Sequence, residues 1–208
     1  MQRLWDISPP IGSDSPLFPG DQPYRQDWTA TIEPGCPVNL GAITMSPHIG
    51  AHADAPLHYR NGAATIGQLP LDPYLGRCRV IHALDAGPLV EPRHLAHASA
   101  ALPPRVLVRT CARAPTRWSP DFSSFAPDTI DWLASHGVKL VGIDSQSVDP
   151  AESKTLPSHH RLLAHDMRVL ENLVLDAIDA GDYELIALPL RLMGFDASPV
   201  RAMLRPLA

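Results

Sequence analysis

The residues best suited to chemistry lie in one short stretch of the chain, from Ser46 to His58. Within it, every ligand-type side chain occupies an even position, namely His48, His52, Asp54 and His58, and the odd positions between them are all apolar or small. Histidine nitrogens and carboxylate oxygens bind metals such as zinc, and histidine also transfers protons near neutral pH. The stretch therefore predicts a metal site with an acid–base group beside it.

Alternation with a period of two indicates extended backbone, because successive side chains of a strand point to opposite faces. A helix fits less well, since Asp54 would point away from His48. Gly50 and Pro56 also disfavour a helix interior. A straight strand would hold His48 and Asp54 ~20 Å apart, whereas the ligands of a zinc ion lie about 2 Å from it. We therefore expect a strand that bends at Gly50.

A row of solvated histidines on a half-buried strand is the alternative interpretation. Four ligand-type residues within eleven positions, with small residues between them, favour the metal site instead, because small residues let the backbone pack closely around an ion. Before this stretch, residues 8–21 are rich in proline and glycine, which predicts a long loop. Such loops are common places for binding sites.

The elements around the stretch are predicted to be mostly strands. Strands are expected at 4–7, 78–84, 105–109, 138–143 and 183–190, and helices at 127–136 and from about 159 onward, with Ser158 as a possible cap. This order predicts an α/β fold with a mostly β core of mixed strands and flanking helices, in a single domain over residues 1–208. Asp144 ends one predicted strand, and we expect it to cap the turn that follows rather than to serve a site.

Composition excludes several classes of function. The formal net charge is -5 and no cluster of Lys and Arg occurs, which argues against nucleic-acid binding. No apolar run is long enough to cross a membrane, and the first residues lack the apolar core of a signal peptide, so a cytoplasmic location is expected. The three cysteines are far apart in the sequence and form no Cys-x-x-Cys pair, so a thiolate zinc site is not indicated.

The pattern from His48 to His58, with Gly50 and Pro56 between the ligand-type residues, resembles the signature of the cyclase family of metal-dependent hydrolases. Ala51, where the general pattern has Thr, resembles the bacterial arylformamidase branch of that family. Further stretches that resemble this branch are 18–21, 144–150, 153–160 and 183–190. The likeness therefore runs almost from end to end.

The resemblance implies a fold, a reaction and an assembly. The fold would be of the swivelling β/β/α-like kind. The reaction would be hydrolysis of N-formyl-L-kynurenine to L-kynurenine and formate in tryptophan degradation. Two zinc ions per subunit would serve it, although manganese and iron accept the same ligand types. The protein would be a homodimer without nucleic-acid or membrane partners.

Five metal ligands follow from the resemblance: His48, His52, Asp54, His159 and Glu171. Asp54 and Glu171 would each contact both ions, since a carboxylate offers two oxygens. His160 stays an alternative to His159. Helical spacing alone would place His160 on the same face as Glu171, whereas the spacing in the family favours His159.

Two further residues receive roles from the resemblance. His58 matches the catalytic histidine, which would give a proton to the departing aniline nitrogen; its alternative role is a third histidine ligand. Phe18 matches a position that lines the substrate pocket and would stack against an aromatic ring. Its alternative is a partly buried loop residue.

Three other functions are compatible with the sequence. One is hydrolysis of another cyclic amide or a lactone by the same family, with only the pocket changed. Another is metal binding without catalysis, which would need ligands but no free proton donor such as His58. The third is a metal-dependent oxygenase, which the additional ligands His159 and Glu171 disfavour.

Overall fold

The computed structural model describes residues 3–207 of the chain. The strands are β1 (Trp5–Asp6), β2 (Arg25–Ala30), β3 (Leu40–Thr44), β4 (His52–Asp54), β5 (Leu75–His82), β6 (Leu89–Val90), β7 (Arg105–Arg109), β8 (Ser124–Phe125), β9 (Leu140–Ile143), β10 (Arg168–Glu171), β11 (Gly181–Ile186), β12 (Ala197–Pro199) and β13 (Met203–Arg205). The helices are α1 (Pro56–Tyr59), α2 (Pro92–Leu95), α3 (Pro127–Ser135) and α4 (Pro157–Ala164), with 3₁₀ turns η1 (Ile66–Gln68), η2 (Asp72–Tyr74) and η3 (Ala96–Ala98).

One nine-stranded mixed sheet forms the centre of the molecule. Its strand order is β1-β13-β11-β5-β7-β9-β10-β4-β12. The four central strands β5, β7, β9 and β10 run parallel, and antiparallel strands extend the sheet on both sides. Strands β9 and β10 are buried along their whole length, as expected for parallel strands covered on both faces. The sheet confirms the predicted α/β class with a mostly β core.

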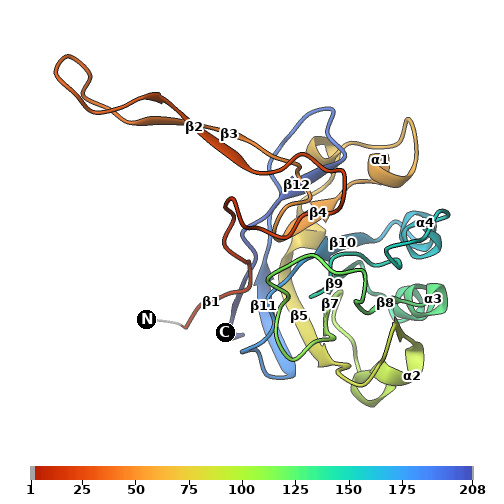
Figure 1. The fold of residues 1–208 in the computed structure, drawn as a ribbon. Helices are drawn as coiled ribbons and strands as arrows, with labels where there is room; N and C mark the ends of the chain where they lie inside the picture. Colours follow the sequence, from red (N-terminus) through yellow and green to blue (C-terminus); the bar gives the residue numbers. More distant parts are fainter. Residues whose placement is uncertain (1–2, 208) are drawn as a thin grey trace.

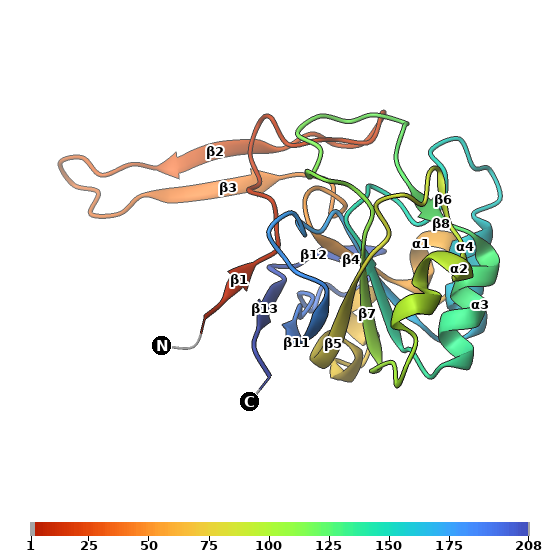
Figure 2. The same ribbon diagram turned by 90° about the horizontal axis from the view of Figure 1, so that it is seen from below.

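Two apolar clusters pack against this sheet. Helices α2, α3 and α4 lie together on one side of it (Figures 1 and 2), and their cluster includes Ile130, Leu133 and Leu162. The second cluster includes Tyr74 and Leu170, and it draws on both parallel and antiparallel strands. The central parallel strands therefore contribute apolar side chains to both clusters.

Several predicted elements are confirmed, and two need correction. The strand at 105–109 and the helix from Pro127 are found where expected. Helix α4 begins at Pro157, and the Ser158 hydroxyl donates to the carbonyl of Phe125, so it does not cap the helix. The last long strand, β11, ends at Ile186 rather than at residue 190, and Pro189, which has no N–H to donate, stands in the part that leaves the sheet.

The most prominent feature outside the core was not predicted. Strands β2 and β3 form a hairpin that projects far from the rest of the molecule (Figures 1 and 2), and among residues 3–207 they pair only with each other. Its apolar side chains are exposed: Trp28, Ile32, Val38, Leu40 and Ile43. Among the described residues, no helix has the length and apolar character needed to cross a membrane.

Candidate metal centre

The backbone bends at Gly50, as the sequence predicts. Gly50 has a φ of +70°, and a Cβ atom there would lie 2.8 Å from Cγ1 of Ile11. Glycine is therefore required both by conformation and by space. The regular strand is shorter than expected: it covers only residues 52–54, and His48 lies in a turn in which the Ile49 amide donates to the Ser46 carbonyl.

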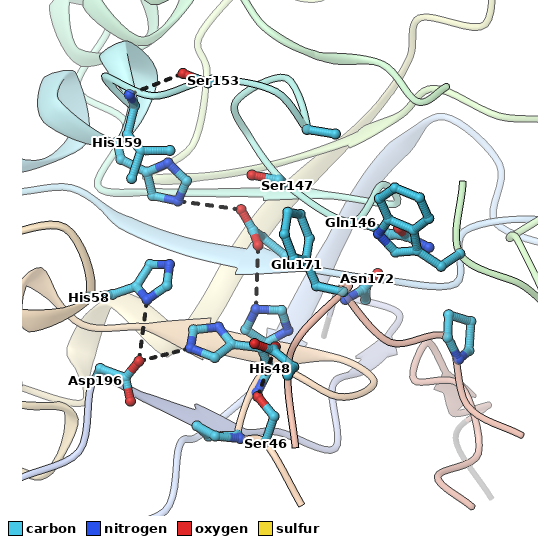
Figure 3. A pocket seen from close by; sticks show the side chains of 18 of the residues that line it. Ser46, His48, His58, Gln146, Ser147, Ser153, His159, Glu171, Asn172 and Asp196 are labelled. Carbon is cyan, nitrogen blue, oxygen red and sulfur yellow. Dashed lines mark hydrogen bonds and ion pairs between the residues drawn. The ribbon is translucent and has the colours of Figure 1, made fainter. Parts of the chain in front are cut away.

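Three elements bring the predicted ligands together. Strand β4 carries His52 and Asp54, and it lies between β10 and β12 in the sheet. Glu171 on β10 is the direct antiparallel partner of His52, so both side chains stand on the same face. His159 comes from the first turns of α4, and its buried side chain faces these residues (Figure 3), whereas His160 is exposed.

Asp54 lies at the centre of the group. One of its carboxylate oxygens, Oδ1, lies 3.2 Å from Nδ1 of His48 and 3.4 Å from Nε2 of His52. The other, Oδ2, lies 3.4 Å from Nε2 of His159. The two oxygens of Asp54 thus face two different groups of histidines.

Glu171 has the same double arrangement. Its Oε2 lies 3.3 Å from Nε2 of His52, and its Oε1 lies 3.7 Å from Nε2 of His159. Oε1 also accepts a hydrogen bond from the backbone amide of Val148 at 2.8 Å, which fixes the carboxylate. Two carboxylates therefore span the same pair of histidines.

The residues fit a metal ion, because the atoms that face one another lack other partners. Within residues 3–207, Nε2 of His52, both carboxylate oxygens of Asp54 and Nε2 of His159 are buried and make no hydrogen bond. Leaving such atoms unpaired is costly unless a ligand satisfies them. Two atoms that each lie about 2.0–2.1 Å from one zinc ion at a tetrahedral angle are about 3.3 Å apart, which matches the separations given above.

The outward ring nitrogens of the same histidines are occupied. Nδ1 of His52 donates to the carbonyl of Gly50 at 3.0 Å, and Nδ1 of His159 lies 2.7 Å from Oδ2 of Asp149. Nε2 of His48 lies 2.9 Å from Oδ2 of Asp196. Metal-binding histidines commonly donate their second N–H in this way, which fixes the ring and its tautomer.

Surplus negative charge dominates the electrostatics. Burial lowers the pKa of His52 and of His159, but nearby carboxylates outweigh this effect and raise the pKa of each to about 10. In His48 the carboxylates of Asp196 and Asp54 likewise overcome burial and raise the pKa to about 9. Burial works against ionisation of Asp54, yet the surrounding histidines hold its pKa well below the usual value. A divalent cation suits such a surplus.

A pocket of about 410 Å³ opens onto this group. His58 lines the pocket, and its ring centre lies 4.4 Å from that of His48. Nδ1 of His58 lies 3.3 Å from Asp196, and a ring nitrogen of His58 also falls within reach of His48 and Asp54. The geometry thus brings His58 to the site and is compatible with either of its expected roles.

Phe18 also lines the pocket, where its ring meets the edge of Trp118 with ring centres 5.8 Å apart. Trp118 was not predicted, and it comes from the loop that follows β7. Phe18 retains 43% exposure, so its face is accessible to a bound molecule. The two rings form an aromatic wall near the metal ligands.

Two expectations about individual residues are wrong. Glu171 does not share a helix with His160, because α4 ends at Ala164 and the chain reverses at Asp166, where φ is +51°. Asp144 does not cap the turn after β9. Its carboxylate accepts hydrogen bonds from the backbone and hydroxyl of Thr110 and so ties the loop after β7 to β9.

Asp149 and Asp196 also belong to the site, and neither was predicted from the sequence. Asp149 lies in the stretch 144–150 that resembles the family, but it has no ligand spacing. Asp196 stands alone in sequence, and only the pairing of β12 with β4 brings it to the site. No signal in a single sequence would have found it.

Comparison with known proteins identifies the family to which the chain belongs. Residues 5–150 match the family described as putative cyclase, so the chain belongs to the cyclase family. A protein of Bordetella pertussis named kynurenine formamidase is 67% identical over 209 residues, which covers 100% of both proteins. One of Delftia acidovorans with the same name is 62% identical, over 100% of this chain and 99% of the relative.

A solved structure described as a potential metal-dependent hydrolase with cyclase activity superposes with a TM-score of 0.87. It is 26% identical, and the match covers 100% of both chains. The cyclase-family fold predicted from the sequence is confirmed by this likeness.

Proposed function

We propose that this protein is a kynurenine formamidase, which hydrolyses N-formyl-L-kynurenine to L-kynurenine and formate in tryptophan degradation. The observation that carries the proposal is the group of buried, unpartnered nitrogen and oxygen atoms of His52, Asp54 and His159, which faces an open pocket. The name shared by relatives at 62–67% identity supports the choice of substrate.

His48, His52 and Asp54 would hold one ion, and His159 with Glu171 would hold a second. Asp54 and Glu171 support a pair of ions, since each directs one oxygen to either side. Imidazole and carboxylate donors without sulfur suit zinc, and manganese or iron accept them too. When bound, such an ion polarises the formyl carbonyl and lowers the pKa of water towards ~7.

His58 is the proposed proton-transfer group. Cleavage of the amide requires a proton on the departing aniline nitrogen, and imidazole has a suitable intrinsic pKa. The His58 side chain is 32% exposed and lies in the pocket wall beside His48, so a substrate can reach it. Phe18 would pack against the aromatic ring of the substrate, with Trp118 behind it.

The hairpin β2–β3 supports the proposal that the protein is a homodimer. A two-stranded hairpin alone is marginally stable in water, and this one exposes several large apolar side chains. A second copy of the chain would cover them. The cytoplasmic location and the assignment of residues 1–208 to one functional domain stay predictions from the sequence.

Formate release from N-formyl-L-kynurenine tests the proposal. Activity should fall after chelation, return with zinc, and fall at least about a hundredfold, to a residual level, in His58→Ala protein that still holds metal. His159→Ala and His160→Ala form a matched pair, because only the first residue faces the site. Full activity after verified metal removal would contradict the metal centre. Absence of activity in metal-replete protein would contradict the substrate and favour a cyclic amide or lactone.

A further inference from the structure

Asp196 occupies its place through its backbone rather than its side chain. It directly precedes β12, whose pairing with β4 sets Ala197 opposite Asp54. The carbonyl of Asp196 accepts a hydrogen bond from the Ala55 amide at 2.8 Å, just before the helix that carries His58. The backbone position therefore does not depend on the carboxylate, and side-chain substitutions at residue 196 can keep the fold.

One oxygen of Asp196 serves two histidines. Oδ2 lies 2.9 Å from Nε2 of His48 and 3.3 Å from Nδ1 of His58, and both contacts are visible in Figure 3. The other two predicted histidine ligands, His52 and His159, donate to the Gly50 carbonyl and the Asp149 carboxylate, and each of these oxygens contacts a single ring. Asp196 therefore differs from them in touching both a predicted metal ligand and the predicted proton-transfer group.

We propose that Asp196 is a positioning residue that fixes the tautomer and orientation of His58 while holding His48. The inference rests on the proposed function. The Nδ1–H of His58 donates a hydrogen bond to Asp196, so Nε2 is the nitrogen left to exchange protons in the pocket. Asp196 accepts this hydrogen bond throughout and is not itself protonated.

The His58 ring then both accepts and releases the proton that the reaction moves. Water adds its oxygen to the formyl carbon and gives a proton to Nε2 of His58. His58 passes that proton to the aniline nitrogen as the carbon–nitrogen bond breaks, which yields the amine and formate after ionisation. While the ring carries both protons, the Asp196 carboxylate at 3.3 Å stabilises its positive charge. Because the same oxygen also holds His48, the ring and the metal ligands keep a fixed relative position.

The kinetic test uses Asp196→Asn alone and combined with His58→Ala, assayed with excess zinc. Asn keeps the shape of Asp but can equally present an amide donor, so His58 loses its fixed tautomer. We expect kcat to fall about 10–100-fold, the range for partners of this kind, with KM changed less than about twofold. In the His58→Ala background the same substitution should lower kcat only a few-fold, because the part exerted through His58 is already lost and only the part exerted through His48 remains.

Asp149→Asn is the matched control, since Asp149 holds His159 but does not touch His58. Its effect should be the same in the presence and in the absence of the His58 side chain. Asp196→Glu keeps the negative charge and should recover part of the lost kcat. Equal losses from Asp196→Asn in both backgrounds would overturn the proposal, as would a His58→Ala protein that binds fewer metal ions than the parent.

A second readout does not depend on turnover. In zinc-loaded protein with ¹⁵N-labelled histidine, ring chemical shifts should show the Nδ1–H tautomer for His58, and this preference should be lost in Asp196→Asn. An unchanged His58 tautomer in the variant would overturn the proposal even if the enzyme is active. If the parent protein fails to hydrolyse N-formyl-L-kynurenine but shows the tautomer and its loss, the substrate is wrong and the positioning role stands.

Discussion

Two neighbouring segments invert the usual distribution of side chains. The hairpin of residues 25–44 exposes large apolar groups such as Trp28 and Ile43, whereas the segment of residues 46–54 buries polar groups such as His52 and Asp54. Both arrangements are costly for an isolated chain. Under the proposed function, each would be explained by something that the chain binds: a cation for the buried segment and a second copy of the chain for the exposed one.

The largest effect should come from the buried segment. Asp54→Asn removes the charge at the centre of the group and one of the two oxygens that face the histidines. Formate release should fall at least about a thousandfold, or about 4 kcal/mol, because a catalytic ion contributes several kcal/mol. Metal content measured by mass spectrometry should fall in parallel. A variant with full metal and near-parental kcat would separate Asp54 from catalysis.

A smaller effect is expected at the aromatic wall of the pocket. Phe18→Ala removes one ring of the aromatic pair with Trp118. KM should rise about 5–10-fold, which corresponds to about 1–1.4 kcal/mol, with kcat within about twofold. Phe18→Tyr keeps the ring and serves as the control. Equal loss of kcat in both variants would show that Phe18 does more than hold an aromatic group.

The smallest effect on activity is expected at the hairpin. Substitutions there test most directly whether a protein surface covers its exposed apolar side chains. Trp28 and Ile43 are diagonal neighbours on one of its faces, since Gln26 pairs with Ile43 and Trp28 with Gly41. Changing both to Ser should yield a monomer by light scattering. If their only apolar contacts are with the partner, the free energy of unfolding of the isolated subunit should stay within about 0.5 kcal/mol.

Asp27→Ser is the control for this double variant, because Asp27 belongs to the same strand but points to the opposite face. It should remain a dimer. A parent protein that is monomeric at micromolar concentration would leave the exposed apolar face without the proposed partner.

Local patterns in the sequence predicted the part of the site that is local in sequence. Gly50 and the alternating ligand-type residues lie within eleven positions, so their spacing alone predicted a bend and a metal. His159 and Glu171 were reached only through the family resemblance. They come from a helix and a strand that lie more than a hundred residues after β4, and the pairing of β10 with β4 is what sets Glu171 beside His52.

Three of the four central strands, β5, β7 and β9, were predictable because their apolar residues are nearly continuous, whereas β10, which carries Glu171, was not predicted. The hairpin was missed because its apolar residues contact no core, so no pattern of burial marks them. Asp196 could not be predicted, since its neighbours are determined by strand pairing between residues more than a hundred positions apart.

The long separation of the ligands also has a consequence for folding kinetics. Asp54 and Glu171 are 117 residues apart in sequence, and β10 joins the sheet only through β9 and β4. Closing such a loop costs entropy that later contacts must offset, so these ligands should meet late in folding. An ion held by both, as proposed, would then stabilise the native state after the folding barrier has been crossed. Bound metal should therefore lower the rate of unfolding and have little influence on the rate of folding.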